Sequence, residues 1–259
     1  MAFNMIRDSD KINLHNHTTY SDGKFTPEDI VEAAVDFGLS HVAITDHYRT
    51  AKVKSIDAEE LRYYTAHIRD LGKKYEGKIR VLVGVEIDSC PERTNLYALP
   101  YALLNDLDFV LFEYVQDDDN GGMPLWQLLK FIKRIRVPVG LAHNDIAKNF
   151  ANVRADVFVR LLSVHGIFIE LCSSLRNSKF GRQYYHYAER FFDFARGKVL
   201  LSIGSDTHNR LSDVGNIEDA VRFVRKLGLV HDLITYHYWS DCLNREGGCT
   251  RGQTRGVES

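Results

Sequence analysis

The chain has 259 residues, of which 44% are hydrophobic and 26% are charged, and its formal net charge is −2. This is the composition of an ordinary globular protein that is long enough to bury a full core. A chain so close to neutrality has no global basic field, so any contact with nucleic acid would need a local basic patch.

The four cysteines form no C-x-x-C pair, which favours buried or incidental thiols in a reducing compartment. The first residues show neither the apolar stretch nor the cleavage signature of a secretory signal. No apolar run approaches the roughly 20 residues that a membrane span needs. We therefore expect a cytoplasmic protein that has no membrane partner.

Short runs rich in Val, Ile and Leu recur along the chain and predict parallel strands that are buried on both faces. The expected strands lie near residues 12–17, 41–45, 81–87, 108–115, 137–143, 166–172 and 199–204. Longer amphipathic segments alternate with these runs. Seven strand–helix units in one chain indicate an α/β fold, a TIM-like (β/α) barrel rather than an open sheet.

The clearest helix begins after Thr26, a capping residue that is followed by Pro27 and two acids, and it ends at Gly38. Further helices are expected at 58–75, 124–136, 155–164, 182–195 and 216–227. We expect a single barrel over residues 1–243. Residues 244–259 are rich in Gly, Arg, Thr and Ser without apolar periodicity, which predicts a disordered tail.

Histidines and acids follow the ends of the predicted strands. They are His15, His17, Asp22, His47, Glu86, His143, Asp206 and His208. Two of the histidines are two residues apart on one strand, so their side chains point to the same face. The carboxyl ends of barrel strands meet at one rim, and imidazoles with carboxylates suit zinc, manganese or iron. The alternative is a set of unrelated histidines, but the remaining histidines lie mostly in helical or loop stretches without this placement.

These motifs resemble those of the polymerase and histidinol phosphatase (PHP) superfamily. The resemblance is carried by His15-Asn16-His17-Thr18, Ser21-Asp22-Gly23, Ile44-Thr45-Asp46-His47, Gly84-Val85-Glu86-Ile87 and Gly204-Ser205-Asp206-Thr207-His208, and it runs from about Lys11 to Val214. It implies a distorted seven-stranded barrel, two or three divalent ions (Zn, Mn or Fe), and hydrolysis of phosphoesters.

The resemblance also implies which residues hold each ion. The first ion would be held by His15, His17, Glu86 and Asp206, the second by Glu86 and His143, and the third by Asp22, His47 and His208. The expected nucleophile is a water activated by the ions that Glu86, Asp206 and His143 hold. Asp46 could orient an imidazole or could form a structural turn, and Glu170 is expected to be a partner of the ligands rather than a ligand.

One position departs from the pattern of the superfamily. Many relatives have a histidine after the fourth strand, where this chain has Val115. Strand alternation places Glu113 on the same face as Val115. We therefore predict that Glu113 replaces the missing ligand of the second ion. The alternative is an unligated glutamate that makes a hydrogen bond beside the ligands.

Basic residues after the sixth strand are candidates for binding the substrate phosphate. Arg176 is the first choice, because its planar guanidinium matches the geometry of phosphate oxygens, and Lys179 is the second. Arg182 and Lys148 are weaker candidates. The alternative for Arg176 is an exposed loop arginine without a role in binding.

These features favour a metal-dependent phosphoesterase that acts on a small phosphorylated metabolite, such as histidinol phosphate or a nucleotide monophosphate. A phosphodiesterase or exonuclease acting on nucleic acid is the first alternative, although the chain shows no obvious basic strip. A non-catalytic binding or regulatory subunit is the second alternative. Retention of the eight strand-end ligands argues against it.

Overall fold

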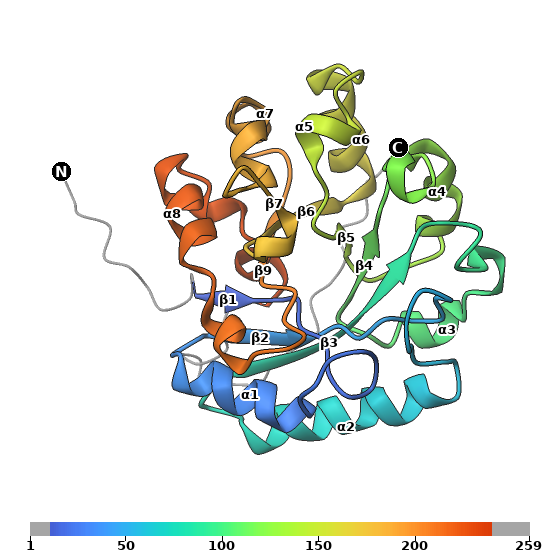
Figure 1. The fold of residues 1–259 in the computed structure, drawn as a ribbon, viewed down its shortest axis with the longest axis vertical. Helices are drawn as coiled ribbons and strands as arrows, with labels where there is room; N and C mark the ends of the chain where they lie inside the picture. The colour runs from blue at the N-terminus through green and yellow to red at the C-terminus, as the bar shows by residue number, and fades with distance from the viewer. Residues whose placement is uncertain (1–10, 240–259) are drawn as a thin grey trace, which may run out of the picture.

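The computed structural model describes residues 11–239, and its strands form a ring that helices surround (Figure 1). One seven-stranded sheet has the order β1-β2-β3-β4-β5-β6-β9, with every neighbouring pair parallel. Its strands are β1 (Ile12–Asn13), β2 (His41–Ile44), β3 (Arg80–Asp88), β4 (Phe109–Glu113), β5 (Val139–Leu141), β6 (Ile167–Cys172) and β9 (Leu201–Gly204). The predicted α/β barrel is confirmed, and the predicted tail at 244–259 lies outside the described residues.

The ring closes through backbone that lies beyond the shortest strand. β1 has only two residues, and the backbone after it bonds to β9 and to the loop that follows β9. Leu14 N donates to Ile203 O at 2.8 Å, and His17 N donates to Thr207 O at 2.9 Å. The first and last strands of the sheet are therefore joined by the segments that carry several predicted ligands.

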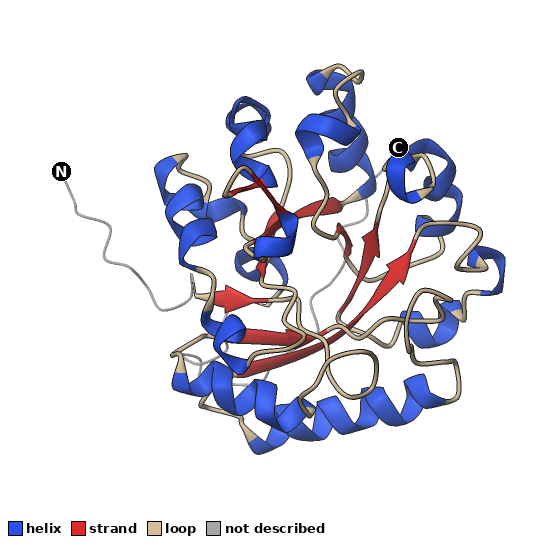
Figure 2. Cartoon of the chain, in the orientation of Figure 1, coloured by secondary structure: helices blue, strands red, loops and turns tan. Residues whose placement is uncertain are grey.

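Helices cover the outer face of the strands (Figure 2). Their bounds are α1 (Pro27–Asp36), α2 (Glu60–Lys74), α3 (Tyr101–Leu104), α4 (Leu125–Ile132), α5 (Ile146–Asn149), α6 (Ala155–His165), α7 (Glu189–Ala195), α8 (Glu218–Lys226) and α9 (Thr235–Tyr238). The start of α1 is as predicted: Thr26 Oγ1 accepts from Asp29 N at 3.2 Å, and Asp29 Oδ2 accepts from Thr26 N at 2.8 Å. This capping box satisfies two backbone donors at the helix start.

The helix expected at 182–195 is wrong in its first half. A two-stranded hairpin, β7 (Ser178–Lys179) and β8 (Arg182–Gln183), occupies this position, a 3₁₀ helix (Tyr184–Ala188) follows, and α7 begins only at Glu189. The chain reverses at Phe180 and Gly181, which have φ angles of 50° and 73°. Arg182 and Gln183, with which the expected helix begins, pair with Lys179 and Ser178 across this turn, so they are extended and not helical, whatever the aromatic spacing suggests.

The strand side chains are buried on both faces, as expected for a barrel with a filled interior. Val83, Phe112, Ile169 and Ile203 are each 0% exposed. Among residues 11–239, no helix is both long enough and apolar enough to cross a membrane. The cytoplasmic location remains a prediction.

Candidate metal centre

The nine candidate ligands lie together at the rim formed by the carboxyl ends of the strands. They fall into four overlapping groups: His17, Asp22, His47 and His208; His15, His17 and Glu86; His15, His143 and Asp206; and His47, Glu86 and Glu113. Within each group the ligand atoms are at most 4.8 Å apart. The structure therefore brings all nine side chains together, and their binding of metal stays a prediction.

The seam between β1 and β9 places three of these residues. Asp206 N donates to His15 O at 3.0 Å, so the two loops are joined at the site itself. Asp206 Oδ1 lies 3.6 Å from His15 Nε2 and 3.3 Å from His17 Nε2, and the two Nε2 atoms are 3.0 Å apart. Asp206 has a φ of 52°, an uncommon conformation that concentrates at functional sites.

Glu86 lies at the centre of the cluster and is 1% exposed. Its Oε1 is 2.9 Å from His143 Nε2, whereas its Oε2 is 3.1 Å from His47 Nδ1 and 3.4 Å from His17 Nε2. Neither Oε2 nor His47 Nδ1 has a hydrogen-bond partner, although both atoms are buried. Buried polar atoms without partners are costly, and a shared cation would satisfy both. The donor set therefore fits divalent metal.

Asp22 contributes a carboxylate on the more exposed side of the cluster. Its Oδ1 lies 3.3 Å from His208 Nε2, 3.7 Å from His47 Nε2 and 3.8 Å from His17 Nδ1. Three imidazoles thus surround a single carboxylate oxygen. This is the group that the resemblance assigns to the third ion, with His17 also in reach.

Asp46 has the structural role that was one of its two expected roles. Its carboxylate accepts from Thr18 N at 2.7 Å, from Thr18 Oγ1 at 2.7 Å and from Ser21 N at 3.0 Å. The turn after His17 is also tight at Gly23, where a Cβ would lie 2.3 Å from His17 O. These constraints fix the loop that carries Asp22.

Glu113 lies at the other side of the rim and is paired with a lysine. Both of its oxygens accept from Lys52 Nζ at 2.7 Å, while Oε1 is 3.6 Å from His47 Nδ1 and Oε2 is 4.0 Å from His143 Nε2. Val115 is fully buried and offers no ligand atom. Lys52 could not be identified from the sequence as part of the site, because a lysine in the loop after β2 belongs to none of the motifs.

Glu170 is the expected partner of the ligands and contacts both sides of the rim. Its Oε1 accepts from His15 Nδ1 at 3.0 Å, and its Oε2 accepts from His143 N at 2.7 Å. The first bond leaves His15 Nε2 free to bind an ion. The carboxylate also requires a glycine at 204, because a Cβ there would lie 2.0 Å from Glu170 Oε1. His143 itself has a φ of 32°, a second uncommon backbone conformation among the candidate ligands.

The pKa values of His17, His143 and His47 are strongly shifted in the metal-free protein. Burial opposes protonation of His17, but its contacts with the carboxylates of Asp206 and Glu86 raise its pKa to about 9. Burial likewise opposes protonation of His143, but the charge of Glu86 and a hydrogen bond to it raise the pKa to about 9. Burial and the positive charge of His17 lower the pKa of His47 to about 3. Metal ions would therefore have to displace protons from His17 and His143.

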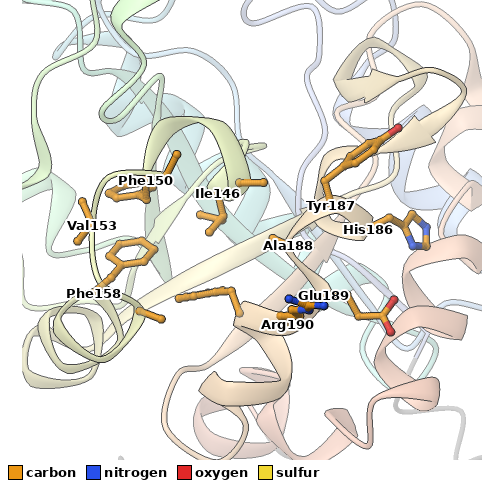
Figure 3. Close-up of a pocket in the computed structure, with 13 residues that line it drawn as sticks. Ile146, Phe150, Val153, Phe158, His186, Tyr187, Ala188, Glu189 and Arg190 are labelled. Carbon is orange, nitrogen blue, oxygen red and sulfur yellow. The ribbon is translucent and has the colours of Figure 1, made fainter.

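A small cavity adjoins His143. Its volume is about 140 Å³, and it is lined by Tyr114, Asp117, Asp119, Asn120, His143, Asn144, Asp145, Lys148, Asn149, Asn177 and Tyr184. A larger cavity of about 630 Å³, lined by residues of α5, α6 and α7 and of the 3₁₀ helix before α7, contains none of the candidate ligands (Figure 3). The small cavity therefore lies where it could hold part of a substrate beside the candidate metal centre.

The two predicted phosphate-binding residues lie apart from the nine ligands. Arg176 is in a short 3₁₀ helix after β6, Lys179 is in β7, and both are exposed. Among the described residues, neither forms an ion pair with a candidate ligand. Asn177, between them, lines the small cavity. Their role in phosphate binding stays a prediction.

The chain is similar to a known protein family and to several known proteins. The sequence profile described as PHP domain matches residues 13–188. A probable phosphatase from Thermoanaerobacter sp. (strain X514) is 27% identical over 232 residues, which are 86% of this chain and 89% of the relative. A DNA polymerase/3′-5′ exonuclease from Bacillus subtilis is 39% identical over 88 residues, but the match spans 34% of this chain and only 15% of that protein.

A solved structure shares the fold. Histidinol phosphate phosphatase from Lactococcus lactis, complexed with zinc, L-histidinol and phosphate, superposes with a TM-score of 0.60 at 16% sequence identity. The match covers 85% of this chain and 94% of that protein.

Proposed function

Because the chain belongs to the PHP domain family, we propose that it is a metal-dependent phosphoesterase that hydrolyses a small phosphorylated metabolite. The observation that carries this proposal is the convergence of five imidazoles and four carboxylates at one rim of the barrel. Two buried ligand atoms in this cluster, His47 Nδ1 and Glu86 Oε2, have no hydrogen-bond partner. Similarity to a probable phosphatase over most of both chains supports the same chemistry.

The residues fit two or three ions of zinc, manganese or iron. Such ions, when bound, would lower the pKa of a water molecule and stabilise negative charge on the phosphoryl oxygens. Glu86 is suited to bridge two ions, because its two oxygens face different imidazoles. The hydrogen bond to Glu170 keeps a proton on His15 Nδ1 and leaves Nε2 facing the cluster. Arg176 and Lys179 are the proposed contacts of the substrate phosphate.

The small cavity beside His143 supports a small leaving group. Its volume of about 140 Å³ corresponds to only a few water molecules. The lining combines two tyrosines with several carboxylates, amides and one lysine, so it suits a polar organic group better than a long polymer. This favours a monoester of a small metabolite over a nucleic acid strand.

The test begins with protein stripped of metal by a chelator and reloaded separately with manganese, zinc or iron. Each form is assayed on a panel of phosphate monoesters that includes histidinol phosphate and nucleoside monophosphates. We expect turnover that depends on metal, is lost in His15→Ala and is retained in His231→Ala, a change at an exposed histidine away from the rim. Metal-loaded protein that is inert toward every phosphoester would overturn the proposal and support a non-catalytic role.

A nuclease is the second candidate, and the β7–β8 hairpin is the feature that favours it. Phe180 at its tip is 90% exposed, with the exposed cations Lys179 and Arg182 on either side. An exposed aromatic ring among basic residues suits stacking of a nucleic acid base. If single-stranded oligonucleotides are the substrate, Phe180→Ala should slow their degradation, and monoesters should not be hydrolysed. Rapid monoester turnover that is unaffected by Phe180→Ala would contradict this candidate.

A further inference from the structure

Lys52 lies beside the least complete group of candidate ligands. Its Nζ donates to both oxygens of Glu113 at 2.7 Å, and Glu113 Oε2 is 4.0 Å from His143 Nε2. The Glu113 side chain is 1% exposed, and the Lys52 side chain is 24% exposed. The ammonium is therefore at the edge of the cluster, on the side where Val115 supplies no ligand.

The backbone around Lys52 is held in place by its neighbours. Lys52 N donates to Thr50 Oγ1 at 3.1 Å, and Thr50 Oγ1 donates to Asp88 Oδ2 at 3.3 Å. Ala51 N donates to Arg93 O at 2.9 Å, and Arg93 Nε is 2.7 Å from Asp88 Oδ2. These contacts tie the loop to the end of β3. The position of the ammonium is thus fixed at its base and does not depend only on a flexible side chain.

Tyr114 provides a further contact for the ammonium. Lys52 Nζ is 3.3 Å from Tyr114 Oη and 4.8 Å from the centre of its ring. Tyr114 follows Glu113 directly and has a φ of 58°, so the backbone turns sharply at this residue. A ring face attracts a cation, which adds to the attraction of the carboxylate.

The charges nearby explain why a cation is needed there. Glu86 and Glu113 are both buried, and both have an oxygen within 3.6 Å of His47 Nδ1. Two buried carboxylates so close together require positive charge. Lys52 supplies one charge and occupies both oxygens of Glu113. A divalent ion between Glu113 and His143 would lie next to the ammonium and would be repelled by it.

We propose that the Lys52 ammonium takes the place of the second cation, so that the chain binds two metal ions rather than three. Glu113 is then the partner of the lysine and not a metal ligand. The inference rests on the metal-binding part of the proposed function. The opposing arrangement has Lys52 orienting Glu113 as a ligand, and the two arrangements predict opposite changes in ion count when the ammonium is removed.

The test counts ions directly. Protein stripped of metal is dialysed against excess Mn²⁺, and bound manganese per chain is measured by plasma mass spectrometry. We expect about two ions in the wild type and about three in Lys52→Met, because loss of the ammonium frees Glu113 and removes the repulsion. The double variant Lys52→Met/Glu113→Gln should return to about two ions, which would assign the extra ion to Glu113.

Two control variants test whether the extra ion depends on loss of the Lys52 ammonium. Lys52→Arg keeps a cation, and Lys54→Met removes a lysine of the same loop whose Nζ donates to Thr19 O and contacts no candidate ligand. Both should match the wild type.

Three ions in the wild type, or no gain in Lys52→Met, would overturn the inference. If Lys52→Met does not fold, Glu113→Gln decides: an unchanged count of two supports the inference, and a lost ion overturns it. Ion counts do not depend on turnover, so inactive protein would count only against the proposed function.

Discussion

The two sides of the rim are built in different ways. At the seam between β1 and β9, His15, His17 and Asp206 approach one another within 3.6 Å and are joined by backbone hydrogen bonds. Beyond the ends of β4 and β5, Glu113 Oε2 and His143 Nε2 are 4.0 Å apart, and the Lys52 ammonium donates to the Glu113 carboxylate. The seam therefore has its ligands already assembled, whereas on the opposite side a lysine balances the charge of Glu113. We expect metal affinity and activity to depend far more on the seam.

The largest effect is expected from Asp206→Asn, which removes a charge from the seam but keeps the shape of the side chain. Asparagine tolerates the positive φ found here, so the fold should survive. Activity should fall by more than about 100-fold, the upper range for residues that only support a ligand. The measurement is kcat/KM with each metal, with the exposed Asp156→Asn as the matched control. A loss smaller than tenfold would show that the seam does not dominate, given that a bound metal ion supplies several kcal/mol.

Glu170→Gln tests the connection between the two sides, because this carboxylate contacts both His15 and His143 N. The amide can keep only one of these bonds in good geometry, since its NH₂ group cannot accept from a backbone N–H. We expect metal affinity to weaken about 10–100-fold. Titration with manganese, followed by a melting curve to confirm folding, provides the measurement. Unchanged affinity would mean that the two sides are independent.

The pH dependence of the metal-free protein tests both sides at once, because His17 and His143 each have a pKa raised to about 9 from an ordinary 6.5. The stabilisation from their protonated forms is complete below pH 6.5 and is lost as the pH rises through 9. Stripped protein should therefore become less stable between pH 6.5 and pH 9.

Metal affinity should rise over the same interval, by about tenfold per pH unit for each proton displaced. Melting temperatures of stripped and manganese-loaded protein at several pH values check both expectations. A stripped protein that gains stability toward pH 9 would contradict the charge balance inferred for His17 and His143.

The smallest effect is expected from Arg176→Ala, outside the two sides of the cluster. If this arginine binds phosphate, KM for a monoester should rise about tenfold, the lower range for a charged hydrogen bond, while kcat changes little. Arg160→Ala, an exposed arginine on α6, is the matched control. Equal KM values for the two variants would assign Arg176 to the solvent-exposed surface alone.

Much of the fold and the rim could be predicted from the sequence, because apolar runs mark buried parallel strands and polar side chains end them. All seven strands of the barrel were predicted, and the position of Glu170 within its strand indicated a supporting role. The first strand is shorter than expected, because after Asn13 the backbone bonds across the seam at Leu14 and His17, although Asn16 O still accepts from Thr45 N just after β2.

The features that could not be predicted depend on contacts between distant segments or on single backbone angles. Lys52 lies beside Glu113 because the hydrogen bonds of Thr50 join the loop that follows β2 to Asp88 at the end of β3. The hairpin of β7 and β8 depends on positive φ angles at Phe180 and Gly181, and the first of these residues gives no signal for such an angle. Periodicity alone therefore extended α7 too far toward its start.

The joining of β1 to β9 also bears on how the protein assembles and how long it lasts. The hydrogen bonds across this seam join segments far apart in the sequence, so forming them carries a large entropic cost of loop closure. An ion held by both His15 and Asp206 would bind the closed ring and not the open chain, and would thereby act as a cross-link between the termini of the sheet. Metal supply in the cell would then govern how long the protein stays folded as well as how fast it hydrolyses its substrate.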